Sequence, residues 1–460
     1  MHWRADGIAT AAGGTVIREA DGEMSGVAID SRSLRPGELF VALRGDRDGH
    51  DFVDTAVAAG AGGILSERGR LHAESVPGAV SIVEVDDTAI ALRSVGAVAR
   101  RRLAEGSARV VGITGSVGKT STKDLTAAAL GATLRVASSE KSFNNEIGVP
   151  LTLANAPEET AVAVIEMGAR GAGHIALLCE IAHPDIAVVT AVAAAHTEAF
   201  GGLDAVAAAK SELVVALPAG GHAVLNGDDT RVANMGHLVP QGAGSALLYS
   251  AAGSAGADLA AEEVELDGDL RPRFTARTPW GSVVVNLEAR GLHQVGNALA
   301  ALGVAGLCGV DLDAAASALR RARLSPWRME VWRTPAGATV INDAYNANPT
   351  SLAAALDALA ALKARRRVAV LGEMAELGER GAEEHLRMAQ VAGDLGVQVI
   401  AVSTSAYGTA AADGIDEALS ILERMNLGEG DAVLVKASRV AGLEELATRL
   451  LASPKRGEGR

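Results

Sequence analysis

The chain has few aromatic side chains and almost no cysteine. Aromatic residues make up 3% of its 460 residues, and the two cysteines are Cys179 and Cys308. Each lies in an apolar run of helical appearance, and two cysteines without metal-ligand spacing exclude both a disulfide scaffold and a cysteine metal site. We therefore expect both to be buried small hydrophobic side chains. With 53 glycines and so few aromatic rings, the composition is typical of α/β layers with aliphatic cores.

Excess positive charge and long apolar runs are also missing. Lys and Arg number 42 against 56 Asp and Glu, which gives a net charge of −14 and argues against a nucleic-acid partner. The N-terminus has no apolar signal region, and no window reaches the roughly 18 apolar residues of a membrane span. We therefore expect a cytoplasmic protein that acts as a monomer.

The length and the pattern of apolar runs predict three α/β domains in series. Residues 1–105 form a small N-terminal α/β domain, and the Gly- and Ser-containing break near Gly106 ends it. Residues 106–324 form a central domain built on a parallel sheet, and residues 325–460 form a C-terminal Rossmann-like domain. The proline after Leu324 marks the second boundary.

The central segment carries four apolar runs of strand length at 109–114, 161–166, 185–190 and 222–226. Helix-length stretches separate them, which predicts a doubly wound parallel sheet. Between about 258 and 288 the runs become shorter and alternate, so we expect an antiparallel edge there. A helix from Gln294 to Leu307 closes the domain.

The sequence VVGITGSVGKTSTK has the features of a phosphate loop, in the shorter GSxGKT form. Gly115 and Gly118 allow the backbone N–H groups of the loop to face an anion, with Ser116 and Val117 between them. Lys119 supplies a positive charge, and the Thr120 hydroxyl can bind Mg²⁺. A plain glycine turn before a helix is the less favoured alternative, so we expect ATP.

Two residues at strand ends are candidate metal ligands. Glu166 ends the run AVAVIE, where a buried carboxylate is costly unless it meets a cation. An acidic residue exposed in a loop is the alternative. His196 follows the next strand, and its imidazole could complete a metal site, although a single His is more often structural.

Two further motifs leave their roles open. Lys210 lies in an alanine-rich helical stretch, where the residues alone favour a solvated lysine or one paired with Glu212 or a phosphate. In VINDAYNANPTS a strand ends at Asp343, and Asn346 and Asn348 follow before a helix. This polar turn indicates either a ligand site or helix caps, with equal weight.

Taken together, these stretches resemble the Mur ligase family of ATP-dependent amide-forming enzymes of cell-wall synthesis. The resemblance covers nearly the whole chain and includes SFNNEIGVPLTL, VIEMGARGAGHI, GLHQVGNALAAL, DAYNANP, LGEMAELG and VLVKASR. DAYNANP with LGEMAELG is similar to the branch that adds D-alanyl-D-alanine to UDP-N-acetylmuramoyl-tripeptide. The branch that adds the third residue carries DNPR, which this chain lacks.

The resemblance implies roles at the ATP site. Lys119 would hold the β- and γ-phosphates, and Thr120 and Glu166 one Mg²⁺ ion. His196 would hold a second ion with Lys210, whose family counterpart is carbamylated, and this implied role replaces the solvated lysine that the residues alone favour. Three further residues would contact ATP. Asn297 would lie toward the base, Arg328 toward the phosphates and Asp343 toward the ribose. One departure is Gln294, where the family often has Asn.

The resemblance also implies substrate contacts. The N-terminal domain would bind the uridine diphosphate through Asp30, Ser31 and Arg32. Asn144 and Asn145 match positions near the phosphates and the sugar-peptide. The incoming dipeptide would meet Asn346, Asn348 and the LGEMAELG loop.

Three other functions fit these motifs less well. Another amide ligase of the same fold, such as a folylpolyglutamate synthetase, is disfavoured by DAYNANP. A nucleotide switch would carry a guanine-reading NKxD, which is absent. A non-catalytic relative would have no reason to keep Lys119, Glu166, His196 and Lys210 together.

Overall fold

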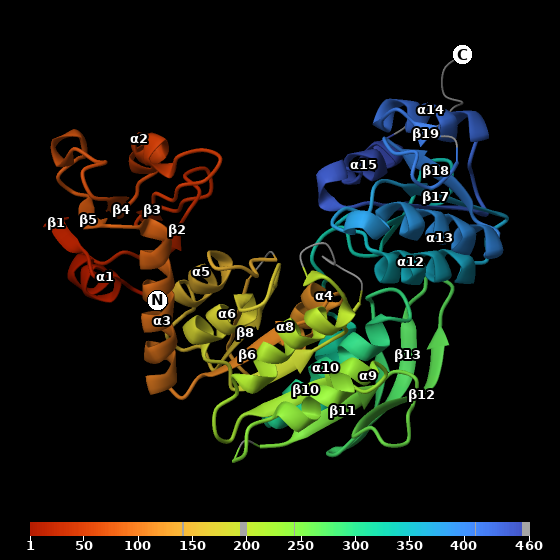
Figure 1. Ribbon diagram of the computed structural model, residues 1–460, viewed down its shortest axis with the longest axis horizontal. Helices are drawn as coiled ribbons and strands as arrows, with labels where there is room; N and C mark the ends of the chain where they lie inside the picture. The colour runs from red at the N-terminus through yellow and green to blue at the C-terminus, as the bar shows by residue number, and fades with distance from the viewer. Residues whose placement is uncertain (140–141, 194–199, 243, 410, 453–460) are drawn as a thin grey trace.

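The computed structural model describes residues 1–139, 142–193, 200–242, 244–409 and 411–452, which form three α/β domains in series (Figure 1). The N-terminal and C-terminal domains lie at opposite ends of the central one. The predicted fold class is confirmed. Among the described residues, no helix combines the length and apolarity needed to cross a membrane.

The N-terminal domain is a five-stranded sheet in the order β1-β5-β4-β3-β2, with β1 antiparallel to β5 and the other pairs parallel. Its long last helix leads into the central domain. The elements are α1 (Ala5–Ala12), β1 (Thr15–Arg18), β2 (Val27–Ala28), β3 (Leu39–Val41), α2 (Val53–Ala58), β4 (Gly63–Glu67), β5 (Ser81–Val85) and α3 (Thr88–Glu105).

The central domain is a nine-stranded sheet in the order β14-β13-β12-β11-β10-β9-β6-β8-β7. Pairs from β7 to β12 are parallel, and β12, β13 and β14 pair antiparallel, as the alternating runs predicted. The elements are β6 (Arg109–Thr114), α4 (Lys119–Leu130), β7 (Val136–Ser138), α5 (Gly148–Ala154), β8 (Val162–Glu166), α6 (His174–Ala182), β9 (Ile186–Val189), α8 (Leu203–Val215), β10 (His222–Asn226), α9 (Thr230–Ala233), β11 (Ala246–Ser250), β12 (Leu259–Leu266), β13 (Pro272–Thr278), β14 (Gly281–Asn286), α10 (Gln294–Leu307) and α11 (Leu312–Arg320).

Helices cover both faces of the central sheet, which explains its nearly continuous apolar strands. In β6, Val110 packs on the side of α6 and α8, whereas Val111 and Ile113 pack on the side of α4 and α10. Cys179 is buried as expected, but Cys308 is only partly buried.

The C-terminal domain is a six-stranded sheet in the order β15-β16-β20-β17-β18-β19. It is parallel except for β15, an antiparallel edge strand that the sequence analysis missed. The elements are β15 (Glu330–Arg333), β16 (Thr339–Asn342), α12 (Pro349–Ala361), β17 (Arg366–Leu371), α13 (Gly381–Asp394), β18 (Gln398–Val402), β19 (Ala411–Ala412), α14 (Ile415–Met425), β20 (Asp431–Lys436) and α15 (Glu444–Ala452).

The junction between the first two domains depends on a close approach of α3 to α5. A Cβ atom added at Gly96 of α3 would lie 2.4 Å from Cβ and 2.5 Å from Cα of Pro150 in α5. Neither atom can move aside, because the proline ring and backbone are rigid. Gly96 thus sets the distance between the two helices.

We predict that Gly96→Ala destabilises the protein by about 1–3 kcal/mol, because the added methyl group overpacks this helix contact. The midpoint of urea unfolding measures the effect. The matched control is Gly393→Ala, another helical glycine, whose Cβ would meet open space. It should be neutral or more stable by up to about 1 kcal/mol. Equal stability of the two variants would contradict the packing argument.

Candidate active site

The phosphate loop follows β6 and turns sharply beside β9. Gly115 has φ of 151° and Gly118 has φ of 83°, which L side chains rarely adopt. A Cβ atom at Gly115 would also lie 1.8 Å from Oγ1 of Thr190. That hydroxyl donates to the carbonyl of Val117 at 2.6 Å. The loop is therefore held in shape by its neighbour, and α4 begins directly after it at Lys119.

The Lys119 ammonium lies over this loop. Its Nζ donates to the carbonyl oxygen of Gly115 at 2.7 Å. The pKa of Lys119 is lowered, mainly by burial and also by the positive charge of Arg328. The carboxylates of Glu166 and Glu376 oppose this shift. An ammonium on a glycine-rich loop at a helix N-terminus suits a phosphate anion, whose charge would offset the cost of burying the cation.

Glu166 ends β8, which pairs with β6 so that Glu166 lies beside Ile113. Its side chain is 1% exposed, so the alternative of an exposed loop residue is wrong. One carboxylate oxygen, Oε1, accepts from Nδ2 of Asn144 at 2.8 Å. Within the described residues the other, Oε2, is buried without a hydrogen-bond partner. A buried anionic oxygen without a donor fits a hard cation such as Mg²⁺.

Thr120 connects the phosphate loop to the C-terminal domain. Its Oγ1 accepts from a guanidinium nitrogen of Arg328 at 2.7 Å and lies 3.0 Å from Oγ of Ser142. The Arg328 guanidinium also stacks on the Tyr345 ring, with 4.1 Å from Cζ to the ring centroid. Trp327 and Met329, on either side of Arg328, have φ of 61° and 54°. A strained backbone on both sides thus presents Arg328 to the loop.

Lys210 lies in α8 and is 3% exposed, so it is not a solvated lysine. Burial, together with the positive charge of Lys119, lowers the pKa of Lys210 to about 7, although Glu212 opposes the shift. The two carboxylate oxygens of Glu212 accept the N–H groups of Gly173 and Ala176 at the start of α6. Glu212 is therefore mainly a helix cap.

His196, the expected partner of Lys210 in a second metal site, lies outside the described residues. Among the described residues no cluster of three His, Cys, Asp or Glu side chains is arranged to hold a metal. The structure thus places Lys119, Thr120, Glu166 and Lys210 at one edge of the central sheet, and the role of His196 stays a prediction.

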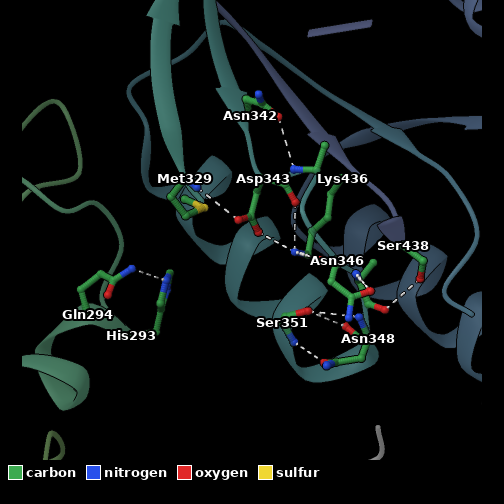
Figure 2. Close-up of polar contacts among 12 residues, drawn as sticks. His293, Gln294, Met329, Asn342, Asp343, Asn346, Asn348, Ser351, Lys436 and Ser438 are labelled. Atoms are coloured by element: carbon green, nitrogen blue, oxygen red, sulfur yellow. Dashed lines mark hydrogen bonds and ion pairs between the residues drawn. The ribbon is translucent and has the colours of Figure 1, made fainter. Parts of the chain in front are cut away.

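Asn297 lies in α10, against the phosphate loop. Its Oδ1 accepts from the Thr122 hydroxyl at 3.1 Å, and its Nδ2 donates to Oε1 of Gln294 at 2.9 Å. A Cβ atom at Gly118 would lie 2.9 Å from the same Oδ1. Gln294 in turn lies 3.1 Å from Nε2 of His293 (Figure 2). Gln294 thus forms part of this network.

Asp343 is held by Lys436, a residue that the sequence analysis did not single out. Nζ of Lys436 donates to Oδ2 of Asp343 at 2.5 Å and to the carbonyl of Asn346 at 2.8 Å (Figure 2). The other carboxylate oxygen accepts from the Met329 N–H at 3.1 Å. In the sequence, Lys436 is marked by its position at the end of a buried strand and within VLVKASR, one of the stretches on which the family resemblance rests.

The two asparagines of this turn make local contacts. Asn348 caps α12: its Oδ1 accepts from the Ser351 N–H at 2.9 Å, and the Ser351 hydroxyl accepts from the Asn348 N–H (Figure 2). Oδ1 of Asn346 accepts from the Ala347 N–H. For Asn348, the cap interpretation matches the contacts.

The other residues predicted to contact substrate come from the N-terminal domain and from the start of α5. Arg32 forms two hydrogen bonds with the Asp30 carboxylate, at 2.9 and 2.7 Å, and Ser31 between them is buried. All three follow β2 in the N-terminal domain, in a different domain from the phosphate loop. Asn145 caps the start of α5, because its Oδ1 accepts from the Gly148 N–H at 2.9 Å.

Comparison with known proteins supports one family over most of the chain. Residues 113–305 match the Mur ligase middle domain, residues 327–439 the Mur ligase glutamate ligase domain, and residues 23–100 the Mur ligase family catalytic domain. The UDP-N-acetylmuramoyl-tripeptide–D-alanyl-D-alanine ligase of Mycobacterium tuberculosis H37Rv is 40% identical, over 94% of this chain and 93% of its own length.

Two crystal structures are also similar along the full chain. A MurF structure from Acinetobacter baumannii is 29% identical with a TM-score of 0.86, and covers 98% of this chain and 99% of its own. The MurF ligase of Thermotoga maritima, solved in complex with ADP, is 28% identical with a TM-score of 0.78. It covers 93% and 97% of the two chains.

We predict that Lys436→Met destabilises the protein by about 3 kcal/mol, because it leaves the Asp343 carboxylate unpaired in a largely buried site. Thermal unfolding measures the loss. In the double variant Asp343→Asn with Lys436→Met both charges are gone, so part of the stability should return. A double variant no more stable than Lys436→Met would show that the ion pair is not the cause.

Proposed function

The chain belongs to the Mur ligase family, and we propose that it joins D-alanyl-D-alanine to UDP-N-acetylmuramoyl-tripeptide at the expense of ATP. The product is the UDP-N-acetylmuramoyl-pentapeptide precursor of peptidoglycan, with ADP and phosphate. One observation carries the ATP half of this proposal: a phosphate loop with a partly buried lysine lies beside the buried Glu166 carboxylate, one oxygen of which has no described donor. The identity of the two substrates follows from the relative of that name and from the resemblance of DAYNANP to the same branch of the family.

The described residues fit a Mg²⁺ ion. The Thr120 hydroxyl and the Glu166 carboxylate would hold it, and His196 and Lys210 a second one. When bound, the metal neutralises phosphate charge and orients the γ-phosphoryl group. Lys119 would replace its contact with the Gly115 carbonyl by one with the β- and γ-phosphates.

The reaction needs no nucleophilic side chain. A carboxylate oxygen of the tripeptide attacks the γ-phosphorus of ATP, and the bond to ADP breaks to give an acyl phosphate. The amine of D-alanyl-D-alanine then attacks the acyl carbon, and phosphate leaves as the amide forms. Lys119 and Arg328 stabilise the negative charge on the transferred group, and the site must exclude water because the acyl phosphate hydrolyses.

We place the UDP moiety at Asp30, Ser31 and Arg32. ATP would lie between Asn297, Arg328 and Asp343, with Gly115–Gly118 around its phosphates. Asn144 and Asn145 would lie near the phosphates and the sugar-peptide. Asn346 and Asn348 would lie near the dipeptide, where the Asn348 cap orders the turn. The substrates favour a cytoplasmic enzyme, and one chain supplies all these groups, which supports a monomer.

The linker near Leu324 would act as a hinge, whereas the packing of α3 on α5 at Gly96 opposes a hinge near Gly106. The Leu324 linker is already fastened to the phosphate-loop helix, because the Ser325 N–H donates to Oδ2 of Asp124 at 2.6 Å. Arg328 makes a second contact from the linker to Thr120. Nucleotide binding at α4 could thus be transmitted directly to the C-terminal domain.

We also propose that Lys210 is carbamylated. Addition of CO₂ requires a neutral amine, and the lowered pKa of about 7 leaves much of Lys210 neutral near physiological pH. The neutral nitrogen bonds to the carbon of CO₂ and loses one proton to solvent, so that an uncharged amine becomes an anionic carbamate. Beside Lys119, an anion is electrostatically more favourable than a second ammonium.

The proposed activity predicts that phosphate release requires ATP, Mg²⁺, UDP-N-acetylmuramoyl-tripeptide and D-alanyl-D-alanine together. A coupled phosphate assay measures the rate, and mass spectrometry identifies the pentapeptide product. Glu166→Gln should lower kcat by a factor of about 100 or more, because the metal loses an anionic ligand. Phosphate release with UDP-dipeptide and a diamino acid instead would reassign the enzyme to the branch that adds the third residue.

The carbamate predicts a ¹³C resonance when the protein is equilibrated with ¹³C-bicarbonate. Lys210→Ala should abolish that resonance, whereas Lys363→Ala, which alters an exposed lysine, should keep it. Wild-type protein without the signal, or Lys210→Ala protein with it, would disprove carbamylation at this position while leaving the ligase assay unaffected.

A further inference from the structure

The guanidinium group of Arg328 lies at the boundary between the central and C-terminal domains. Its Nη2 donates to the Thr120 hydroxyl of the phosphate-loop helix at 2.7 Å. One face of the group stacks on the ring of Tyr345, with 4.1 Å from Cζ to the ring centroid. Within the described residues its Nε is buried and has no hydrogen-bond partner. A buried cationic donor without an acceptor is costly, so it fits a site that an oxygen of a ligand completes.

The backbone on both sides of Arg328 is fixed to the C-terminal domain. The Met329 N–H donates to Oδ1 of Asp343 at 3.1 Å (Figure 2), and the Met329 side chain is 2% exposed in the core of that domain. The Trp327 carbonyl accepts from the Tyr345 N–H at 3.3 Å. Arg328 therefore moves with the C-terminal domain, whereas the hydroxyl that it contacts belongs to the central domain.

The stacked ring decides the directions in which this cation can donate. The five N–H groups of a guanidinium lie in its plane, so a ring against one face leaves donation only along the edges. An arginine without such support samples many rotamers, and ordering it has an entropic cost. The Tyr345 ring thus orders the group within the C-terminal domain, before the phosphate loop is reached. The contact with Thr120 then depends on how the two domains are arranged.

The proposed reaction requires a cation whose direction is already set. Negative charge is spread over the oxygens of the γ-phosphoryl group during its transfer. A donor stabilises that charge best when it needs no reorganisation at the moment of reaction. Lys119 provides a point charge from the loop itself, whereas Arg328 donates only in one plane. The orientation of that plane therefore matters for the rate.

We propose that Tyr345 is a positioning residue for Arg328. Its ring fixes the plane of the guanidinium so that the edge with the buried Nε meets an oxygen of the transferred phosphoryl group when the domains close. The assignment rests on the proposed ligase function. Tyr345 acts through Arg328 and needs no contact with substrate, so its effect falls on turnover. Affinity for ATP depends instead on the phosphate loop and Lys119.

The first test changes the electrons of the ring while keeping its shape. Phenylalanine and its mono-, di- and trifluorinated forms at position 345 are nearly equal in size, but each fluorine weakens the attraction of the ring face for a cation. Tyr345→Phe should keep kcat for pentapeptide formation within about threefold of wild type. Across the fluorinated series kcat should fall stepwise, by about tenfold in total, while KM for ATP stays within about threefold. A constant kcat across the series would overturn the role of Tyr345, because a ring that only fills space is insensitive to fluorine.

A double-mutant cycle tests the same role through Arg328. Arg328→Lys keeps the charge but loses the planar group, so it should lower kcat by about tenfold in the wild-type background. In the Tyr345→Leu background the further loss should be only about twofold, because the plane is no longer held. Losses that multiply independently would overturn the proposal.

The matched control removes the same kind of stack far from the site. The Arg102 guanidinium lies over the Trp3 ring, 4.4 Å from its centroid, in the N-terminal domain. Arg102→Lys should therefore keep the kcat of wild type. A wild-type enzyme that forms no pentapeptide would instead overturn the proposed function, and the role of Tyr345 with it.

Discussion

Burial of charge at one edge of the central sheet is the constraint on which the rest of the structure depends. Lys119, Glu166 and Lys210 come from three different elements and meet where parallel strands end, and burial lowers the pKa of both lysines. Neighbouring protein groups compensate these charges only in part. Within the described residues, Oε2 of Glu166 is buried and has no hydrogen-bond partner. Such an arrangement is poor for stability but well suited to a ligand that brings both phosphate charge and metal charge.

The C-terminal domain adds further polar groups to those of the phosphate loop. Its polar groups gather at the ends of β16, β17 and β20, and two buried residues of that region, Lys436 and Ser438, hold the neighbouring turns together. Arg328 and the Asp124 contact of Ser325 then attach this assembly to the phosphate-loop helix. The residues of the candidate site are therefore contributed by both domains.

The sequence was most informative where burial on both faces imposed a pattern. The bounds of β6, β10 and α10 agree with those predicted, because apolar runs of that length and context have few other solutions. The edge strand β15 was missed, since an edge strand has little apolar signal. The spacing of the phosphate loop identified its glycines. The reason why residue 115 must be glycine could not be predicted, because the Thr190 hydroxyl that occupies the space comes from the end of another strand. The same limit applies to the Lys436–Asp343 pair and to the hydrogen bonds by which the Glu212 carboxylate caps α6, because each joins segments far apart in the sequence.

The α3 helix joins the N-terminal domain to the centre without a break. Its 18 residues, at about 1.5 Å each, form a strut of about 27 Å that is locked to α5 by the Gly96 contact. Under the proposed function the nucleotide of the precursor would bind the N-terminal domain, and this helix would fix the distance from there to the phosphate loop. The enzyme would thus select its substrate by length. A peptide stem one residue too short or too long would place its carboxylate away from the γ-phosphate, even if its terminal residue were correct.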